Sequence, residues 1–102
     1  MQPSYYEDFS EIKKKIWSLL DNAVKDRSSP FRIPVFACGN QNDIDGRIVV
    51  LRKSDQKNNL VQFHSDIRSD KIELLKNNPN AALLFYDKDE KIQVRLKVNC
   101  II

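Results

Sequence analysis

After Pro30, the sequence is a series of short runs rich in β-branched and aromatic residues, separated by polar turn-forming stretches. These runs predict strands over 31–38, 47–53, 60–65, 81–86 and 92–102. Within the first run, Pro34 indicates an edge strand or a bulged position. Strands joined by short turns favour an antiparallel sheet that curls into a barrel over a doubly wound parallel sheet. The expected fold class is therefore mainly β with flanking helices.

The last of these runs alternates between apolar and polar residues. Ile92, Val94, Leu96 and Val98 fall on one predicted face, and Gln93, Arg95 and Lys97 fall on the other. The strand pattern continues to the end of the sequence without a closing turn. We therefore expect this strand to be covered by a partner chain, or the sequence to be the front part of a longer fold.

Two helices are predicted, over 5–26 and 70–78. The first carries apolar residues at spacings of three and four, namely Phe9, Ile12, Ile16, Leu19, Leu20, Ala23 and Val24. Ser4 and Glu7 have the spacing of a capping box, and the stretch 27–30 ends the helix before Pro30. Trp17 lies at the edge of the apolar stripe and is interpreted as packing. Pro79 stops the second helix.

The stretch 39–46 is turn-forming in composition, and the runs 47–53 and 60–65 are expected to form a hairpin. A length of 102 residues predicts one domain, spanning 1–102. No apolar run approaches the roughly 20 residues that span a bilayer, and the N-terminus lacks the pattern of a signal peptide. We therefore expect a cytoplasmic protein without membrane attachment.

Charge and cysteine content exclude two further classes of function. Lys plus Arg number 17 against 14 acidic residues, and this net charge of +3 is too weak to indicate nucleic-acid binding. Cys38 and Cys100 have no spacing typical of a metal site. Buried, reduced thiols are the expected state in a reducing compartment.

The segment "HSDIRSDK" (64–71) places hydroxyls and cations where the second helix begins. Ser69 is a suitable N-cap, and Arg68 and Lys71 add positive charge to a helix end that is already partly positive. An anion at this point would gain charge-assisted hydrogen bonds from both side chains. The alternative is a solvated turn in which Asp66 and Asp70 neutralise the bases. Phosphate binding and the solvated turn both stay open.

Further polar residues could complete such a site. Arg47 and Arg52 stand at the two ends of the run "RIVVLR" and point to opposite faces unless a bulge intervenes. One arginine could hold a phosphate while the other meets a different part of the ligand, although simple solvation explains both. Gln93 could hydrogen-bond the edge of a heteroaromatic ring, or be an exposed sheet residue.

The blocks "RIVVLR", "LVQFHSDIRSDK", "LLKNNPNAALLFYD" and "QVR" resemble, in this order and spacing, the pyridoxamine 5'-phosphate oxidase family of FMN-binding split β-barrels. The leading "IWSLLDNAVKDRSSPFRIPVFA" is similar to the subgroup described as related to that oxidase. The resemblance covers roughly residues 16 to 99. It implies an FMN-binding split β-barrel, incomplete at the C-terminus, with FMN held at the interface of a homodimer.

The resemblance also implies roles for individual residues. Arg47 and Lys71 match the residues that contact the FMN phosphate, and Arg68 and Ser69 fit the "RSxK" form of the phosphate loop. Asp70 stands where the oxidases commonly have arginine, which implies a contact moved to Arg68. The remaining residues implied to contact the flavin are Ile48, Val49, Val50, Leu51, Arg52, His64, Ser65 and Gln93.

Two functions follow from the resemblance. The first is a flavoprotein oxidoreductase acting on a small-molecule substrate that the sequence does not identify. The second is a non-catalytic flavin-binding or dimerising module, because the second half of the oxidases, with their substrate-phosphate groups, has no counterpart here. His64 is interpreted as a packing or backbone contact and not as a general base. A nucleic-acid binder is disfavoured, because Phe63, Phe85 and Tyr86 stand in apolar runs and not among exposed bases.

Overall fold

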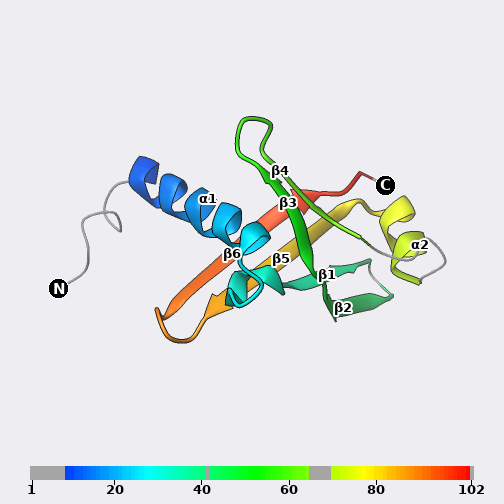
Figure 1. Cartoon of the computed structure of the whole chain (residues 1–102). Coiled ribbons are helices and arrows are strands. Elements are labelled where there is room, and N and C mark those ends of the chain that lie inside the picture. The colour runs from blue at the N-terminus through cyan, green and yellow to red at the C-terminus, as the bar shows by residue number, and fades with distance from the viewer. Residues whose placement is uncertain (1–8, 41, 65–69, 102) are drawn as a thin grey trace.

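A computed structural model describes residues 9–40, 42–64 and 70–101 of the chain. It is mainly β with two α-helices, as the sequence predicts (Figure 1). The elements in chain order are α1 (Phe9–Lys25), a 3₁₀ helix η2 (Pro30–Arg32), β1 (Val35–Gly39), β2 (Ile44–Ile48), β3 (Leu51–Asp55), β4 (Leu60–Phe63), α2 (Asp70–Asn77), β5 (Asn80–Asp87) and β6 (Ile92–Asn99). The segments at 5–8 and the predicted capping box lie outside the described residues.

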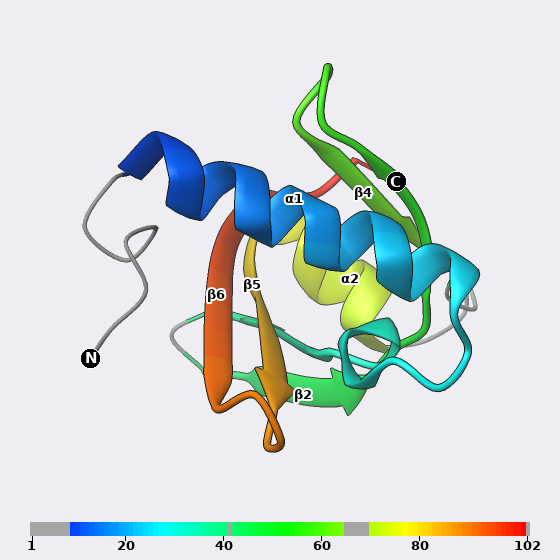
Figure 2. The same ribbon diagram turned by 60° about the vertical axis from the view of Figure 1, so that its left-hand side comes forward.

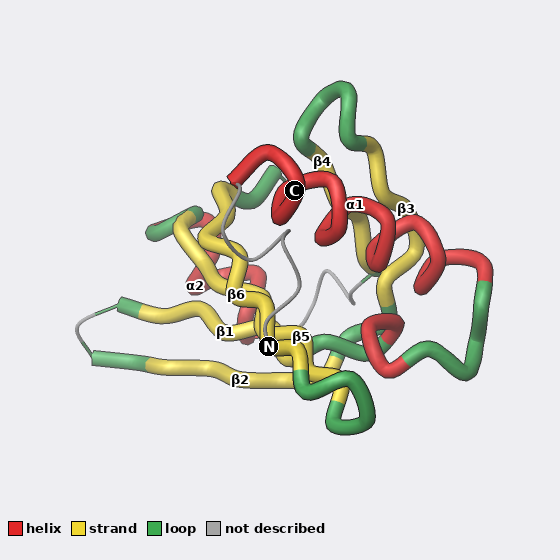
Figure 3. Tube along the Cα trace, turned by 90° about the vertical axis from the view of Figure 1, so that its left-hand side faces the viewer, coloured by secondary structure: helices red, strands yellow, loops and turns green. Residues whose placement is uncertain are grey.

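The strands form two antiparallel sheets that do not close on each other. One sheet has four strands in the order β2-β1-β5-β6, and the other is the β3–β4 hairpin. The predicted antiparallel arrangement and the predicted hairpin are confirmed. Figures 2 and 3 show α1, α2 and the hairpin on the same side of the four-stranded sheet, with the hairpin tip projecting beyond them.

The prediction of one continuous strand over 47–53 is wrong. The chain leaves the four-stranded sheet after Ile48 and enters the hairpin at Leu51, so the run is divided between β2 and β3. At this corner, the backbone N–H of Val49 donates to the carbonyl of Pro34 (3.0 Å). Arg52 then lies where the β3–β4 register shifts, between Leu51 and Lys53. A β-rich composition fixes the local extended conformation but not the sheet that each half joins.

The prediction for 31–38 is also partly wrong. Its first residues form η2, because Ser29 is extended and its hydroxyl accepts from the Phe31 N–H (3.2 Å), which caps a turn with proline at its start. The strand begins only after Pro34. β1 is an internal strand between β2 and β5, and not the predicted edge strand or bulged position. Pro34 lies just before the strand, so its missing N–H group removes no hydrogen bond from the ladder.

The stretch 39–46 is not a turn throughout, since β2 begins at Ile44. The turn is held by the Asn40 side chain, which accepts from the N–H groups of Asn42 (2.8 Å) and Asp43 (2.9 Å). Gly39 is required here by a close approach, because a Cβ atom would lie 2.5 Å from the Asp43 carbonyl oxygen. Glycine, asparagine and aspartate therefore mark a tight hairpin connection that is shorter than their full run.

The core lies between the four-stranded sheet and the elements on its covered side. From α1, Leu20 and Ala23 are fully buried, which confirms the predicted apolar stripe, and Trp17 packs against the core. Phe36 of β1 contacts Phe63 of β4, with ring centroids 4.8 Å apart. The other buried members of this core are Phe31, Cys38, Val49, Leu51, Leu75, Leu83, Phe85 and Val94.

The opposite side of the four-stranded sheet carries no described element, and we call it the outer face. Cross-strand partners share a face, so Val35, Ile48 and Leu84 lie in one row across β2, β1 and β5. Ile44 and Tyr86 belong to the same face by strand alternation. These five side chains are 37–88% exposed. The outer face is therefore an uncovered apolar surface over β2, β1 and β5.

β6 confirms the predicted alternation, because its Ile92, Val94, Leu96 and Val98 are less exposed than the residues between them. The strand ends at Asn99 and not at the end of the chain. The last hydrogen bond of its ladder with β5 runs from the Cys100 N–H to the Pro79 carbonyl (2.8 Å). Both cysteines are free thiols; Cys38 is buried and Cys100 is only partly so. None of the helices in the described ranges has the length and apolar content needed to cross a membrane.

Candidate functional site

Arg47 lies on β2, on the side of the sheet that faces the core. Its strand neighbours Ile48 and Gly46 belong to the outer face, while Arg47 and Asp45 pair across the ladder with the buried residues Phe36 and Cys38. Because β2 is the edge strand, the Arg47 side chain reaches solvent and is 43% exposed. Its Nε donates to both Asp45 carboxylate oxygens, at 3.1 Å and 2.9 Å.

Helix α2 covers the same side of β1 and β2. A hollow of about 400 Å³ separates the β1–β2 turn from the helix; Asp43 and Asp45 line one wall, and Glu73, Leu74 and Asn77 line the other. The Asn78 side chain donates to the Gly39 carbonyl (2.8 Å), which fixes the C-terminal end of α2 beside the turn. Glu73, in the first turn of α2, lines this hollow together with Asp45, which stands two residues before Arg47 on β2. The first turn of α2 therefore lies on the same side of the sheet as Arg47.

The N-terminus of α2 has the properties of an anion site. Its first N–H groups have no partners within the helix, and the helix dipole makes this end partly positive. Lys71 belongs to the first turn of α2, as predicted, but its side chain is outside the described part of the structure. Ser65, Arg68 and Ser69 also lie outside the described residues. Of the groups that the family resemblance assigns to the phosphate, the structure describes the Arg47 side chain and the α2 backbone.

An apolar corner adjoins this seat. Val49 is 6% exposed and Leu51 is 1% exposed, and Val50 between them is half-buried. His64 is exposed and follows Phe63, the cross-strand partner of Leu51, so it lies at the same end of the hairpin. Ile48 is 69% exposed on the outer face, on the opposite side of β2 from Arg47. The stretch from Ile48 to Leu51 thus connects β2 of the four-stranded sheet to β3 of the hairpin.

Gln93 and Arg52 lie apart from Arg47 within one chain. Gln93 is exposed on β6 opposite Tyr86, on the outer face and at the other edge of the sheet from β2. Arg52 is exposed on β3, beyond the corner. The sequence-based candidates therefore fall into a group around the β2–β3 corner and a separate residue, Gln93. A single chain does not bring Gln93 to the α2 end of β2.

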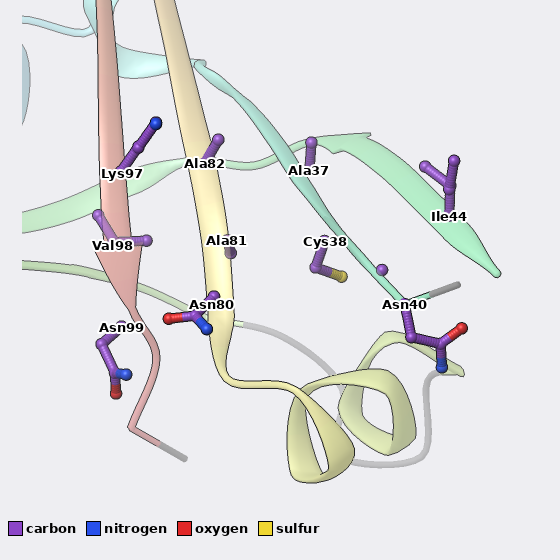
Figure 4. A pocket seen from close by; sticks show the side chains of 11 residues that line it. Ala37, Cys38, Asn40, Ile44, Asn80, Ala81, Ala82, Lys97, Val98 and Asn99 are labelled. Atoms are coloured by element: carbon purple, nitrogen blue, oxygen red, sulfur yellow. The ribbon is translucent and has the colours of Figure 1, made fainter. Parts of the chain in front are cut away.

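A second hollow, of about 690 Å³, lies on the sheet near the other end of β2 (Figure 4). Ala37 and Ala82 form part of its floor, with Ile44 on one side and Lys97 on the other. It opens widely to solvent and carries few polar groups. Among the described residues, histidine, cysteine, aspartate and glutamate side chains form no group of three or more that could hold a metal ion.

Asp45 is the residue of this site that the sequence reading missed. Because the stretch 39–46 is turn-forming in composition, none of its carboxylates was predicted to lie beside Arg47. The alternation of Ile44, Gly46 and Ile48 with Asp45 and Arg47 is the signal that indicates a strand and places the acid beside the arginine. Glycine and two aspartates within the segment concealed that period-two pattern.

A family model for the FMN-binding domain of pyridoxamine 5'-phosphate oxidase matches residues 13–102. The chain belongs to this family. A solved structure of a pyridoxamine 5'-phosphate oxidase-related, FMN-binding protein from Nostoc punctiforme has a similar fold, with a TM-score of 0.69 and 22% sequence identity. The alignment covers 84% of this chain but only 44% of that protein. No curated protein sequence matched the chain.

The residues of the seat fit the cofactor of this family. FMN carries a terminal phosphate, for which a guanidinium and a helix N-terminus are suitable donors. In the described part of the chain, Asp45 is the only hydrogen-bond partner of Arg47 and occupies Nε alone, which leaves both terminal nitrogens for an anion. Next to the buried Val49, the half-buried Val50 offers apolar surface to an aromatic ring. The donor set therefore suits FMN.

Proposed function

We propose that this protein is an FMN-dependent oxidoreductase whose phosphate seat is formed by Arg47 and the start of α2. The proposal is supported by the place of Arg47 on the covered side of the sheet and by the hollow that Asp45, two residues before it, shares with Glu73 in the first turn of α2. Lys71, Arg68, Ser69 and Ser65 join the seat in this proposal, as the family resemblance implies. In this proposal, the backbone N–H groups of α2 and the named side chains would both donate hydrogen bonds to one phosphate dianion.

When bound, FMN would accept an electron pair from a small-molecule substrate and pass it to oxygen or another acceptor. The chain's own part is to bind and orient. Ile48, Val49, Val50 and Leu51 would line the flavin mainly through their backbone, because Val49 and Leu51 are buried and the Ile48 side chain lies on the outer face. His64 would contact the flavin at the end of the hairpin. Arg52 would place a positive charge near the ring, where it stabilises an anionic reduced form. The charge at Arg52 would therefore favour reduction.

We further propose that the protein is a homodimer joined through the outer face. Its five exposed side chains, named above, present on the order of 500 Å² of apolar surface, at the upper end of what a monomer usually exposes. Gln93 lies on this same face and cannot reach the Arg47 of its own chain. In a dimer joined through the outer face, Gln93 would lie at the interface between the two copies. A reducing compartment such as the cytoplasm would suit the two free thiols.

The phosphate seat is tested by Arg47→Gln, which keeps a polar side chain and removes the charge. We expect FMN to bind about 10- to 100-fold more weakly, the range for losing one charge-assisted contact, while riboflavin, which lacks the phosphate, binds as before. Arg27→Gln is the matched control, because Arg27 is an exposed residue of the turn after α1. Fluorescence titration of the apoprotein measures both ligands. An Arg47→Gln protein with native FMN affinity would contradict the proposal.

A non-catalytic flavin-binding module is the second candidate. The chain spans 44% of the length of the Nostoc protein, so turnover is tested separately from FMN binding. Anaerobic mixing of the FMN-loaded protein with amines or reduced nicotinamide cofactors separates the two functions. Bleaching of the flavin absorbance, followed by recovery on admission of oxygen, is expected of the oxidoreductase. A flavin that only dithionite reduces would identify the module.

A further inference from the structure

We propose that Asp45 is a positioning residue, which holds the Arg47 guanidinium so that its two terminal nitrogens face a phosphate. This inference rests on the FMN-binding function proposed above. Arg47 Nε donates to Asp45 Oδ1 at 3.1 Å and to Oδ2 at 2.9 Å. A guanidinium is planar, so fixing Nε–H fixes the direction of the opposite edge. The two terminal nitrogens carry the other four N–H groups, and the two that point along this edge can bind two phosphate oxygens together.

Asp45 is well placed to act as an anchor. It stands two residues before Arg47 on the same side of β2, and its backbone is held in register opposite Cys38 of β1. Its side chain is 22% exposed, against 43% for that of Arg47. It also borders the hollow against Glu73 and Leu74 of α2. A short, half-buried acid thus restrains a long side chain that stands on an edge strand.

The need for an anchor follows from the position of Arg47. An arginine at the rim of a sheet has many rotamers, and binding a ligand must select one of them at an entropic cost. The Asp45 contact removes most of this freedom before the ligand arrives. The same carboxylate also repels a phosphate dianion. Positioning and repulsion act in opposite directions, so the affinity of the native protein alone does not separate them.

Two neutral variants separate them. Asp45→Asn removes the charge but keeps an oxygen that accepts from Arg47 Nε, whereas Asp45→Ala removes both. We expect Asp45→Asn to bind FMN about three- to tenfold more tightly than Asp45→Ala, the factor for ordering one arginine side chain in advance. Riboflavin should bind both variants equally. Fluorescence titration measures each affinity, and thermal unfolding of each apoprotein verifies that both variants are folded.

A second pair of variants tests whether the effect passes through the guanidinium. Lysine at position 47 keeps the charge but has no Nε–H edge to orient, so the difference between Asp45→Asn and Asp45→Ala should vanish in the Arg47→Lys background. A general structural role of Asp45 would leave the difference unchanged, and that result would overturn the proposal. Equal FMN affinity of Asp45→Asn and Asp45→Ala would also overturn it, while leaving the proposed function intact. Failure of all these proteins, the native one included, to bind FMN would overturn both.

Discussion

Single residues decide how the elements of this protein begin, end and face one another. Arg32 donates from Nη1 to the carbonyls of Ala23 (3.3 Å) and Val24 (2.9 Å), so the last turn of α1 is held by a cation at its negative end. The Ser54 hydroxyl contacts the Asp21 carboxylate and ties the hairpin to α1. On β2, strand alternation places Arg47 on the covered side of the sheet and Ile48 on the outer face. Local contacts of this kind place each candidate group.

Asp26 gives a prediction at the residue scale. Hydrogen bonds from the Ser28 hydroxyl (2.7 Å) and the Ser28 N–H (2.9 Å) hold the pKa of Asp26 below its ordinary value, and Arg32 contributes a smaller effect. A carboxyl whose pKa is lower in the folded state stabilises the fold above its unfolded pKa of about 3.9. That contribution is lost as the pH falls through the folded pKa.

We therefore expect the free energy of unfolding to fall more steeply below about pH 4 in the native protein than in Asp26→Asn. Urea denaturation at a series of pH values measures the difference. Asp26→Glu serves as the control, because it keeps a titrating group at this position. Parallel pH profiles for the native protein and Asp26→Asn would show that the Ser28 contacts do not stabilise the ionised form.

At the scale of the elements, the sequence correctly predicted those with a periodic pattern. It did not predict where a run of residues is divided between two elements. The alternation of β6 and the apolar stripe of α1 follow from a period that burial on one side imposes. The division of 47–53 between β2 and β3 could not be predicted, because both halves are extended and differ only in their partner strands. Likewise, η2 depends on the N-cap by Ser29, and the sequence alone does not show that Ser29 has the extended conformation that this cap requires.

The candidate site shows the same limit. The sequence left an anion seat at the start of the helix 70–78 and a solvated turn both open, and the family resemblance implied Arg47 as a phosphate contact. In the structure, β2 and α2 lie on two sides of one hollow. It did not predict that Asp45 binds Arg47, because the acid was assigned to a turn. It also could not show that Gln93 lies at the far edge of the sheet, since strand order is set by long-range pairing. Site geometry across strands therefore required the structure.

At the scale of the whole molecule, one side of the main sheet is covered and the other is not. Ile44 is 88% exposed on the outer face and is not among the residues proposed to contact FMN. We expect Ile44→Lys to shift the protein from dimer to monomer, because a charge there must be desolvated when the two faces meet. The stability of the isolated chain should change by only about 0.5 kcal/mol, as for other exposed positions.

Light scattering coupled to size-exclusion chromatography measures this change over a range of concentrations. The matched control is Leu60→Lys. Leu60 has the same number of side-chain carbons as Ile44 and is also exposed (39%), but it belongs to the hairpin and not to the outer face. The control should keep the native mass in solution. A dimer that survives Ile44→Lys and dissociates with Leu60→Lys would assign the interface to the hairpin instead.

The central claim is that a phosphate anchors the cofactor between β2 and the start of α2. Titration of the native apoprotein with FMN and with riboflavin tests it most directly, because the two ligands differ only by that phosphate. We expect FMN to bind at least about 100-fold more tightly than riboflavin, the lower limit for two charge-assisted hydrogen bonds, with the difference shrinking as salt is raised. Equal affinities for the two ligands, or no binding of FMN, would contradict the account.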